Sequence, residues 1–454
     1  MTGFLFTLAA FAVAIAILVA VHEYGHFQVA RWSGVRVLRF SIGMGRPVLR
    51  RQGRDGTEYV LAALPIGGYV KMLDEREGEV AEEESHRAFN RQPLNRRFAI
   101  VAAGPVANFL FAIAAYAVML MIGVGGLQST IEHVAADSPA AEAELRAGDR
   151  LVSIDGRETP TWNSAVQALL PAALDGRTVP VTVDRGGTPV TTELSVPRMV
   201  DTAEGGGDLG GWVGLRPERP AIPPVLGEIV AGSPAAEAGL RAGDRILAID
   251  GRAIADWRAL VEVVRSRPGE SMRVAFERDG ERREIALRPE RIEGADGTTH
   301  GRMGAAVEPP GRLPDEYRAV LRQGPVSAFI DGGARTWETA TMTLKMLGRM
   351  VTGQASLENL SGPITIAQYA GHTAGGGLVQ FLAFLAVVSI SLGIINLLPV
   401  PLLDGGHLMY YCVEFVKGSP VSERTEAIGQ QIGIPAIIGL MTLAFYNDLA
   451  RLFQ

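Results

Sequence analysis

Four long segments without a charged side chain limit what this chain can fold into. They are Gly3–Val21, Phe98–Leu127, Thr373–Leu403 and Ala427–Asn447. A helix needs about 20 predominantly apolar residues to cross the hydrocarbon core of a bilayer, and each segment is about that long or longer. The segments predict an α-helical polytopic membrane protein with four transmembrane helices, joined by polar regions that carry the charged residues.

The first segment is interpreted as a retained span and not as a signal peptide. No basic residue precedes its apolar run, no small-residue cleavage site follows it, and it continues directly into His22-Glu23. A secretory signal would have both of the missing features. The fourth segment is the weakest candidate, because Gln430, Gln431 and Pro435 interrupt it.

Positive charges predict the orientation of the spans. Residues 31–97 contain 13 Lys and Arg, whereas none precedes the first span. Because loops rich in Lys and Arg stay in the cytoplasm, we expect residues 31–97 to be cytoplasmic. The insert 128–372 and the C-terminus then lie on the outer side. The acidic run Glu82-Glu83-Glu84 is interpreted as a solvated surface.

Composition excludes two kinds of site. Cys412 is the only cysteine, so an intramolecular disulfide and a cysteine zinc site are both ruled out. The formal net charge of −6 gives no electrostatic reason to expect a nucleic-acid partner. Any bound metal must therefore use His and carboxylate ligands.

The insert contains an internal repeat with a constant offset of 95 residues. A repeated unit of this length is most simply two copies of one domain. The motifs recur without a gap, as Ser138–Ala143 and Ser233–Ala238, Arg146–Arg150 and Arg241–Arg245, Ile154–Arg157 and Ile249–Arg252, and Trp162 and Trp257.

Each copy has an interpretable order of elements. Ser-Pro-Ala-Ala predicts a short helix with Ser at the N-cap and Pro at the first position. Gly-Asp then leads into an apolar strand that ends at a tight Asp-Gly turn. The first copy has Glu144 where the second has Gly239, so its helix exit is expected to differ.

This pattern resembles bacterial PDZ domains, which bind extended peptides by adding them to a sheet edge. The resemblance implies two inserted α+β PDZ domains, with peptide C-termini as ligands. The peptide-binding strands would lie near Gly211–Leu215 and Gly304–Val307. The alternative is that both copies are spacers with filled grooves.

Residues 312–360 have a helical and amphipathic pattern. Trp337, Leu344 and Met350 form an apolar side, with Arg335 and Lys345 interleaved. This pattern favours a helix at the membrane surface beside the third span. A soluble packing helix is the alternative.

The sequence His22-Glu23-Tyr24-Gly25-His26 closes the first span and carries the chemistry. Two His four residues apart project from one face of a helix and can bind one ion. Glu23 lies beside that face, where it can take a proton from a water whose pKa zinc lowers to about 7. Ionisable residues in a span are costly unless they coordinate a metal or line a wet cavity. The motif predicts a zinc site, and two helix-terminal His near the headgroups are the alternative.

A catalytic zinc site usually has a third protein ligand and one open position. An odd-numbered span ends at the same leaflet as the first, so the end of the third span can supply that ligand. Asp404 is predicted to do so, with His407 supporting the ligands, and Gly405-Gly406 allows close backbone approach. Other His lie in hydrophilic segments and are interpreted as surface residues: His86, His133, His300 and His372.

The two metal motifs together resemble the site-2 protease family of intramembrane zinc proteases. The second motif is Asn-x-x-Pro-x-Pro-x-Leu-Asp-Gly-Gly-His, over residues 396–407. Gly104–Asn108 and Asn359–Pro363 also match, so the resemblance covers nearly the whole chain. The tandem PDZ insert narrows it to the regulator-of-sigma-E type of this family.

The resemblance implies a role for each motif residue. His22, His26 and Asp404 would bind Zn²⁺, and Glu23 would activate water. Asn396 would hold substrate backbone or stabilise the oxyanion. The substrate-binding residues would be Gly67, Gly68, Tyr69, Asn108, Pro399 and Pro401.

The same resemblance implies that residues 43–71 form a re-entrant β segment. Strand-like stretches at Pro47–Arg51 and Glu58–Leu64 flank the turn region Gly53–Gly56. By resemblance, this segment would pair with an unwound substrate helix. A helix hides its peptide bonds, so a protease in a bilayer must extend its substrate before attack.

The implied function is hydrolysis of a peptide bond within the transmembrane segment of a single-span membrane protein, such as an anti-sigma factor, that has already been trimmed outside. The protein would lie in a bacterial inner membrane, with periplasmic PDZ domains and an active site toward the cytoplasm. The alternatives are a non-catalytic PDZ membrane scaffold and a transporter with ionisable residues in its spans.

The resulting division of the chain has nine parts. They are span one with the zinc motif (1–30), the cytoplasmic loop with the β segment (31–97), span two (98–127), PDZ domain 1 (128–217), PDZ domain 2 (218–310), the amphipathic linker (311–372), span three with Asp404 (373–404), a cytoplasmic loop (405–426), and span four with the tail (427–454).

Overall fold

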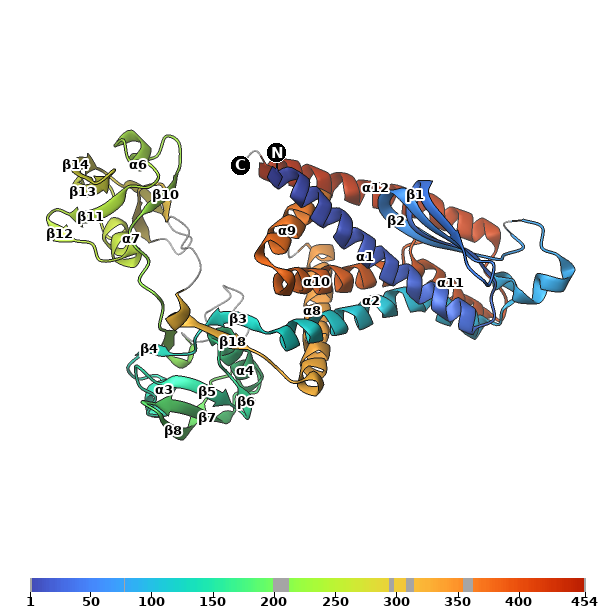
Figure 1. Ribbon diagram of the computed structural model, residues 1–454, viewed down its shortest axis with the longest axis horizontal. Coiled ribbons are helices and arrows are strands. Elements are labelled where there is room, and N and C mark those ends of the chain that lie inside the picture. The colour runs from blue at the N-terminus through green and yellow to red at the C-terminus, as the bar shows by residue number, and fades with distance from the viewer. Residues whose placement is uncertain are drawn as a thin grey trace. The chain divides into compact units, whose positions relative to one another are not determined.

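The computed structural model describes residues 2–76, 78–198, 212–293, 298–307, 314–353 and 362–452. The chain divides into two compact units (Figure 1). The membrane unit consists of Met1–Val124 and Arg322–Gln454, and the insert unit consists of Gly125–Leu321.

Four helices among the described residues of the membrane unit are long and apolar enough to cross a membrane. They are α1 (Thr2–Trp32), α2 (Leu94–Ile122), α10 (Leu378–Leu397) and α12 (Glu423–Leu452). Helix α2 packs against both α1 and α10. Three further helices complete this unit: α8 (Pro325–Val351), α9 (Pro363–Gly376) and α11 (Asp404–Lys417). Short helical turns lie at η1 (Glu82–Arg87) and η2 (Phe89–Arg91).

The predicted bounds of the third span were wrong at both ends. Gly377 has a φ of 111°, which separates α9 from α10. Helix α10 ends at Leu397 because Pro399 and Pro401 cannot continue its hydrogen bonding. The first span extends in the other direction: α1 continues to Trp32, so the His-Glu motif lies inside a helix.

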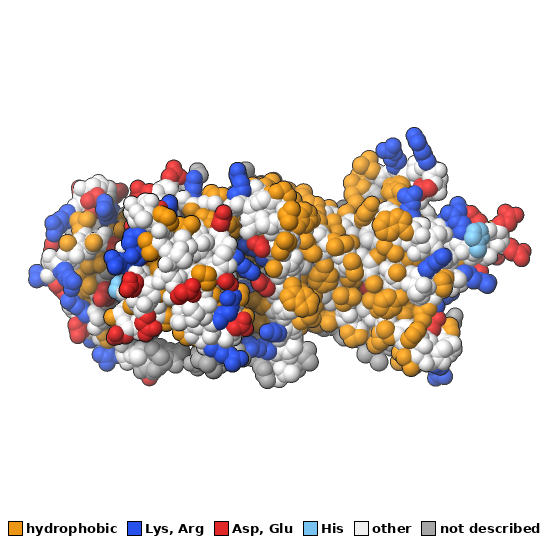
Figure 2. All heavy atoms as spheres, turned by 90° about the horizontal axis from the view of Figure 1, so that it is seen from below, with side chains coloured by type: hydrophobic (Ala, Val, Ile, Leu, Met, Phe, Trp, Pro, Cys, Tyr) orange, Lys and Arg blue, Asp and Glu red, His pale blue; other side chains and the backbone are white. Residues whose placement is uncertain are grey.

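The surface of the membrane unit is rich in exposed apolar side chains. Figure 2 shows a broad region in which hydrophobic side chains predominate and charged ones are sparse. Exposed apolar residues on the long helices include Phe4, Leu110, Trp337, Ile438 and Leu440. Large exposed apolar surfaces mark contact with lipid or protein partners.

The predicted strands around the Gly53–Gly56 turn are confirmed and are longer than expected. They form an antiparallel hairpin of β1 (Val37–Gln52) and β2 (Glu58–Met72). The strands bend, so residues 39–42 pair with Glu58–Leu61 on one side and with residues 68–71 on the other. Residues 68–71 therefore form an edge of this sheet, and no other described strand pairs with them.

The two repeat copies have the same sheet topology. The first has the order β6-β5-β7-β8 and the second β12-β11-β13-β14. A separate strand pair accompanies each copy, β4 with β9 and β10 with β17. The elements of the first copy are β4 (Ile131–Val134), α3 (Pro139–Glu142), β5 (Arg150–Ile154), β6 (Arg157–Glu158), α4 (Trp162–Asp175), β7 (Thr178–Arg185), β8 (Thr188–Ser195) and β9 (Leu215–Pro217).

The second copy repeats these elements in the same order and also has the strand pair β15–β16, which has no counterpart among the described residues of the first copy. They are β10 (Leu226–Ile229), α6 (Pro234–Glu237), β11 (Arg245–Ile249), β12 (Arg252–Ala253), α7 (Trp257–Arg265), β13 (Met272–Arg278), β14 (Glu281–Leu287), β15 (Glu290–Glu293), β16 (Thr299–Arg302) and β17 (Ala305–Val307). Of the two strands predicted to bind peptide, Gly211 lies outside the described residues. The remainder overlaps β9 and β17, and peptide binding stays a prediction.

The predicted caps of the short helices are confirmed. The side chain of Ser138 accepts a hydrogen bond from the N–H of Ala141, and Ser233 does the same for Ala236. The expectation that the first copy would leave its helix differently was wrong. Glu144 has a φ of 54° and is left-handed like Gly239, so the first copy accepts a strained non-glycine residue at this position.

A buried ion pair supports this exit in both copies. Asp149 is 1% exposed, and its two carboxylate oxygens accept hydrogen bonds from Arg185 at 2.8 and 2.7 Å. Arg185 also donates to the carbonyl of the left-handed Glu144 at 2.9 Å. In the second copy, Asp244 and Arg278 make the same contacts, including a bond to the carbonyl of Gly239.

Helix α8 confirms only part of the predicted helical linker. Before it, β18 (Arg318–Leu321) pairs with β3 (Val124–Leu127), preceded by the turn η3 (Asp315–Tyr317). The N–H of Gln128 also donates to the carbonyl of Tyr317 at 2.8 Å. The two chain ends of the insert unit are therefore adjacent.

The C-terminal helix anchors α9. Asp448 on α12 is buried, and its carboxylate accepts hydrogen bonds from the backbone N–H groups of Gly362, Ile364 and Thr365. A distant side chain therefore caps the α9 N-terminus. Of the motif at residues 359–363, the first three residues lie outside the described part of the chain.

We predict that Asp149→Asn destabilises the insert unit by about 2–3 kcal/mol, below the cost of breaking a fully buried pair because Arg185 stays partly hydrated. Burial alone would raise the pKa of Asp149, but hydrogen bonds from Arg185 and the Arg146 N–H hold it below the usual value. A depressed pKa stabilises the fold above the unfolded-state pKa of about 3.9 and loses that effect as pH falls.

Denaturant unfolding of the fragment 125–321 at pH 7, 5 and 3 measures this. The stability difference between wild type and Asp149→Asn should be equal at pH 7 and 5 and smaller at pH 3. Asp175→Asn is the control, because the Asp175 side chain is 71% exposed and its carboxylate lies 3.9 Å from Arg177, a long and solvent-exposed ion pair. The effect of this substitution should stay below about 0.5 kcal/mol. Equal effects of the two substitutions at pH 7 would contradict a special role for the buried pair.

Candidate metal centre

Helix α1 brings the two predicted His ligands together on one face. The Nε2 atoms of His22 and His26 lie 3.3 Å apart, and the two rings are nearly perpendicular. The i, i+4 spacing explains this, because residues one turn apart lie above one another. His26 is buried and His22 nearly so.

The predicted third ligand also reaches this face. Asp404 is the first residue of α11, and its Oδ2 lies 3.2 Å from Nε2 of His22 and 3.4 Å from Nε2 of His26. Gly405 and Gly406 allow this approach: a Cβ on either would collide with backbone carbonyls of the preceding turn. The expectation of a close backbone approach at these glycines is confirmed.

The three donor atoms fit a zinc ion. Zinc–nitrogen and zinc–oxygen distances of about 2.0–2.2 Å in a tetrahedron give ligand–ligand distances of about 3.3–3.5 Å. The three observed separations are 3.2, 3.3 and 3.4 Å. Oδ2 of Asp404 is buried, and no hydrogen-bond donor among the described residues satisfies it. A cation held between this oxygen and the two imidazole nitrogens would satisfy it.

Hydrogen bonds behind the rings orient both His. Nδ1 of His26 lies 2.8 Å from the carbonyl of Ile100, to which it donates, so Nε2 keeps its lone pair for a metal. Nδ1 of His22 lies 3.0 Å from Nδ2 of the Asn108 side-chain amide, and Oδ1 of Asn108 is buried without a partner. The oxygen and nitrogen of an amide are assigned from hydrogen bonding. Exchanging the two atoms would let Oδ1 accept from Nδ1–H of His22 and would satisfy that oxygen.

Glu23 occupies the position expected of a proton acceptor. Its carboxylate interacts electrostatically with His22, His26 and Asp404. The side chain packs beside the β2 edge, because a Cβ on Gly68 would lie 3.0 Å from Cγ of Glu23. The acid that can move a proton and the sheet edge that can bind an extended chain are therefore neighbours.

Close packing of α1 on α2 supports the ligands. A Cβ on Gly104 would collide with the ring of His26 and lie 2.9 Å from the ring of His22. On the other helix, a Cβ on Gly25 would collide with the Ala103 carbonyl. Gly25 therefore lets the helices approach, and Gly104 leaves the space that the imidazoles fill.

The other residues of the second motif lie in varied surroundings. Asn396 is half-buried on the last turn of α10. Pro399 is exposed, whereas Pro401 packs against Gly429 and Gly433 of α12. His407 is exposed, with its ring 6.4 Å from that of Tyr410. Its predicted support of the ligands is not borne out by any described contact.

The residues expected to bind substrate also divide into two groups. Gly67 and Gly68 lie on β2, and the Tyr69 hydroxyl accepts a hydrogen bond from Arg39 at 3.1 Å. Asn108 is fully buried against His22. The contact that Asn108 makes in the structure is therefore with the proposed metal ligand His22. Substrate contact by Gly67, Gly68, Tyr69 and Asn108 remains a prediction.

Sequence reasoning missed three contributors to this site. The Ile100 carbonyl belongs to the backbone, so the residue type gives no sign of its role. Gly104 was part of a motif shared with the family, but its contact with the ligand rings was not predicted. Arg97 on α2 forms a hydrogen-bonded ion pair with Glu414 of α11 at 2.5 Å, and both side chains are largely buried. This pair joins the helix beside the His rings to the helix that begins with Asp404.

Comparisons with known proteins agree with this chemistry. Residues 10–440 match the family described as Peptidase family M50. The regulator of sigma-E protease RseP from Escherichia coli K12 is 45% identical over 465 residues, which cover 100% of both chains. Protease RseP from Yersinia pestis is 44% identical, also over 100% of both chains.

Two other similarities differ in strength. A Neisseria meningitidis protein whose name describes a zinc metalloprotease is 40% identical over 98% of this chain and 99% of its own. The solved PDZ domain of an SdrC-like protein from Listeria monocytogenes matches 18% of this chain and 84% of its own at 20% identity. Its TM-score of 0.16 is too low to bear on the fold.

We predict that Gly104→Ala lowers zinc affinity by about 10–100-fold, the range seen when groups around metal ligands are altered. The added methyl group must displace a ligand ring, because it collides with His26. Zinc content after dialysis against graded chelator, measured by atomic absorption, checks this. Gly439→Ala on α12 is the control, since a Cβ there meets nothing within 4 Å. Equal zinc retention by both variants would contradict the packing argument.

Proposed function

Because this chain belongs to peptidase family M50, the site-2 proteases, we propose that it cuts within the transmembrane segment of a single-span membrane protein whose external domain has already been trimmed. The chain is a zinc metalloprotease of a membrane. The observation that carries the proposal is the cluster of His22, His26 and Asp404, whose two His lie with Glu23 in a helix apolar enough to span a bilayer.

In the proposed hydrolysis, Glu23 and Asn396 have separate roles beside the bound zinc. Bound zinc supplies Lewis acidity, lowering the pKa of a water molecule to about 7 and polarising the scissile carbonyl. Glu23 accepts the proton of the attacking water and returns it to the leaving amine. The side-chain amide of Asn396 binds substrate backbone or the developing oxyanion.

The free edge of the hairpin supports the binding of an extended substrate. Residues 68–71 present unpaired backbone groups on one side, and Gly68 contacts the side chain of Glu23. A substrate segment that unwinds and adds as a strand would satisfy these groups and bring its peptide bonds beside the acid. Tyr69 and Gly67 would then contact the substrate from β2.

The insert unit is proposed to act as two periplasmic PDZ domains that filter substrates. Relatives named as regulators of sigma-E protease suggest an anti-sigma-factor-like substrate in a bacterial inner membrane. The Arg-rich loop 31–97 supports an orientation with the metal centre toward the cytoplasm. With this orientation, the insert would meet external substrate domains first.

A non-catalytic PDZ membrane scaffold is the second candidate. It would use the two repeat copies for assembly. It gives no reason for three ligand atoms at tetrahedral spacing or for an acid beside them. A transporter would not need the two repeat copies of the insert unit. Activity of a Glu23 variant separates these functions.

We predict that Glu23→Gln keeps zinc and loses about 10²–10⁴-fold of the cleavage rate, the usual contribution of general acid–base catalysis. The measurement is cleavage of a single-span reporter by purified protein in detergent, with zinc content determined on the same sample. Asp404→Asn is the companion variant and should lose both zinc and activity. Unchanged cleavage by Glu23→Gln would refute the protease assignment.

We predict that removing the insert unit broadens substrate choice. Because β3 pairs with β18, residues 129–316 can be replaced by a short Gly-Ser turn without stretching the chain. Cleavage of a trimmed reporter should persist, and an untrimmed reporter should now also be cut. If the untrimmed reporter remains intact while the trimmed one is cut, the insert is not the filter.

A further inference from the structure

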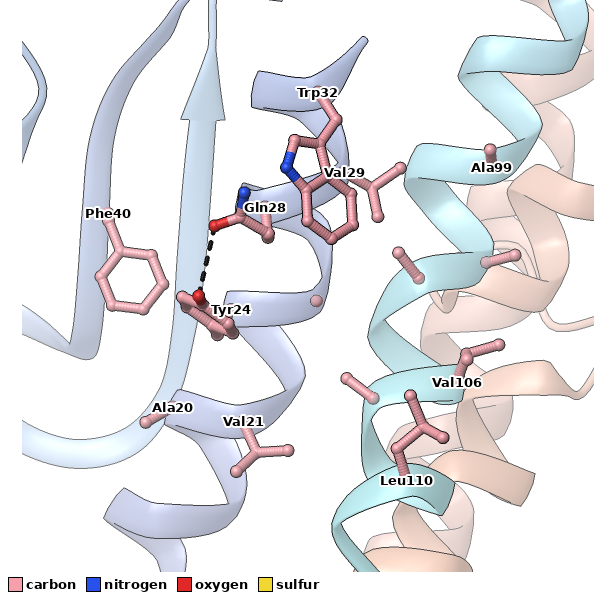
Figure 3. A pocket seen from close by; sticks show the side chains of 14 residues that line it. Ala20, Val21, Tyr24, Gln28, Val29, Trp32, Phe40, Ala99, Val106 and Leu110 are labelled. Atoms are coloured by element: carbon pink, nitrogen blue, oxygen red, sulfur yellow. Dashed lines mark hydrogen bonds between the residues drawn. The ribbon is translucent and has the colours of Figure 1, made fainter. Parts of the chain in front are cut away.

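An apolar groove runs between α1 and α2 on the surface of the membrane unit (Figure 3). Its volume is about 770 Å³. Small and aliphatic side chains of both helices wall it, with Phe40 of β1 on a third side. Tyr24 and Gln28 are the polar residues of the lining, and the Tyr24 hydroxyl donates a hydrogen bond to Oε1 of Gln28 at 3.2 Å.

The groove has the length of one lipid leaflet. On α2 it extends from Ala99 to Leu110, which is about 16 Å at 1.5 Å per residue. Half of a hydrocarbon core about 30 Å thick is about 15 Å. One end lies beside Trp32, which is 76% exposed at the end of α1, as expected for an aromatic residue at the interface.

The lining favours an acyl chain. The groove is lined by 14 residues, and none of them is charged. A hydrocarbon chain can lie along such a lining without leaving a polar group of its own unsatisfied.

A cation without an acidic partner marks the end of the groove at Trp32. Arg96 is one turn before Ala99 on the same face of α2, and its Nη1 donates to the Ser33 carbonyl at the end of α1. Two neighbouring arginines are ion-paired, Arg31 with Asp55 and Arg97 with Glu414. Arg96 has no carboxylate within ion-pair distance among the described residues.

The first turn of α2 adds to this positive end. Its N-cap is Pro93, no side chain caps it, and its first turn has no acidic residue. The partial positive charge of a helix N-terminus favours an anion at such a place. An exposed guanidinium at the mouth of an apolar groove of leaflet length is complementary to one class of molecule.

We propose that this groove binds one acyl chain of an anionic phospholipid, whose phosphate is held by Arg96 and the α2 N-terminus. The chain then lies along Ala99, Val106 and Leu110 on one wall and along Val21 on the other. The amide of Gln28 faces the chain just below the headgroup. This site depends on the membrane location of the protein and not on its proteolytic activity.

The position of the groove gives the lipid a structural role. Gly25 lies in the groove between the two ligand His, and Ala103 and Ala107 contact it from α2. A Cβ on the next α2 residue, Gly104, would meet both ligand rings. An acyl chain in the groove would therefore pack against the α1–α2 contact that determines the spacing of the His ligands.

Native mass spectrometry of the full-length Glu23→Gln protein tests this, after extraction from bilayers with equal phosphatidylglycerol and phosphatidylcholine. Because this variant is used throughout, the result is independent of catalysis. We expect one retained lipid, with about fivefold preference for phosphatidylglycerol, as one Arg near a surface contributes about 1 kcal/mol. Arg96→Gln should reduce the preference to about one, and the exposed Arg54→Gln should leave it unchanged.

A groove-filling substitution tests the chain separately. Val106→Phe should abolish lipid retention, whereas Val118→Phe is the matched control on the same helix; both valines are exposed, and Val118 lies outside the groove. Equal retention by Val106→Phe and wild type overturns the site. The site is also overturned if Val106→Phe retains lipid but loses self-association or substrate-helix binding, because a protein helix and not a lipid then occupies the groove.

Discussion

The contact between α1 and α2 is the constraint on which the metal centre depends. The absence of a side chain at Gly25 lets the two helices approach, and its absence at Gly104 leaves the space that the ligand imidazoles fill. The same contact supplies the Ile100 carbonyl and the Asn108 amide that orient those rings. A helix pair packed with larger side chains would hold His22 and His26 on one face without fixing their tautomers.

The third ligand depends on a break in secondary structure. Pro399 and Pro401 end α10, and Gly405-Gly406 allows α11 to begin against the preceding turn with Asp404 as its first residue. The Arg97–Glu414 pair then fastens α11 to α2. The irregular backbone between the two helices directs a carboxylate at two His.

The insert unit shows how a repeat preserves structure where its sequence differs. Glu144 and Gly239 are unlike residues, yet both are left-handed, and the Arg that ends β7 or β13 donates to each carbonyl. The buried Asp–Arg pair maintains this exit in both copies. The departure seen in the sequence therefore changes local strain and leaves the path of the chain unaltered.

Local pattern alone determined much of this protein. The lengths of the apolar segments, the His-Glu-x-x-His spacing and the Ser-Pro caps each follow from residues near one another in the chain. The 95-residue repeat follows from comparing the chain with itself. Tertiary structure decided the rest: the split of the third predicted span at Gly377, the unpaired edge at residues 68–71, the exposed position of His407, and the contacts of Gly104 and Asn108 with the ligands. These depend on distances between segments far apart in sequence, which close packing fixes and no local pattern records.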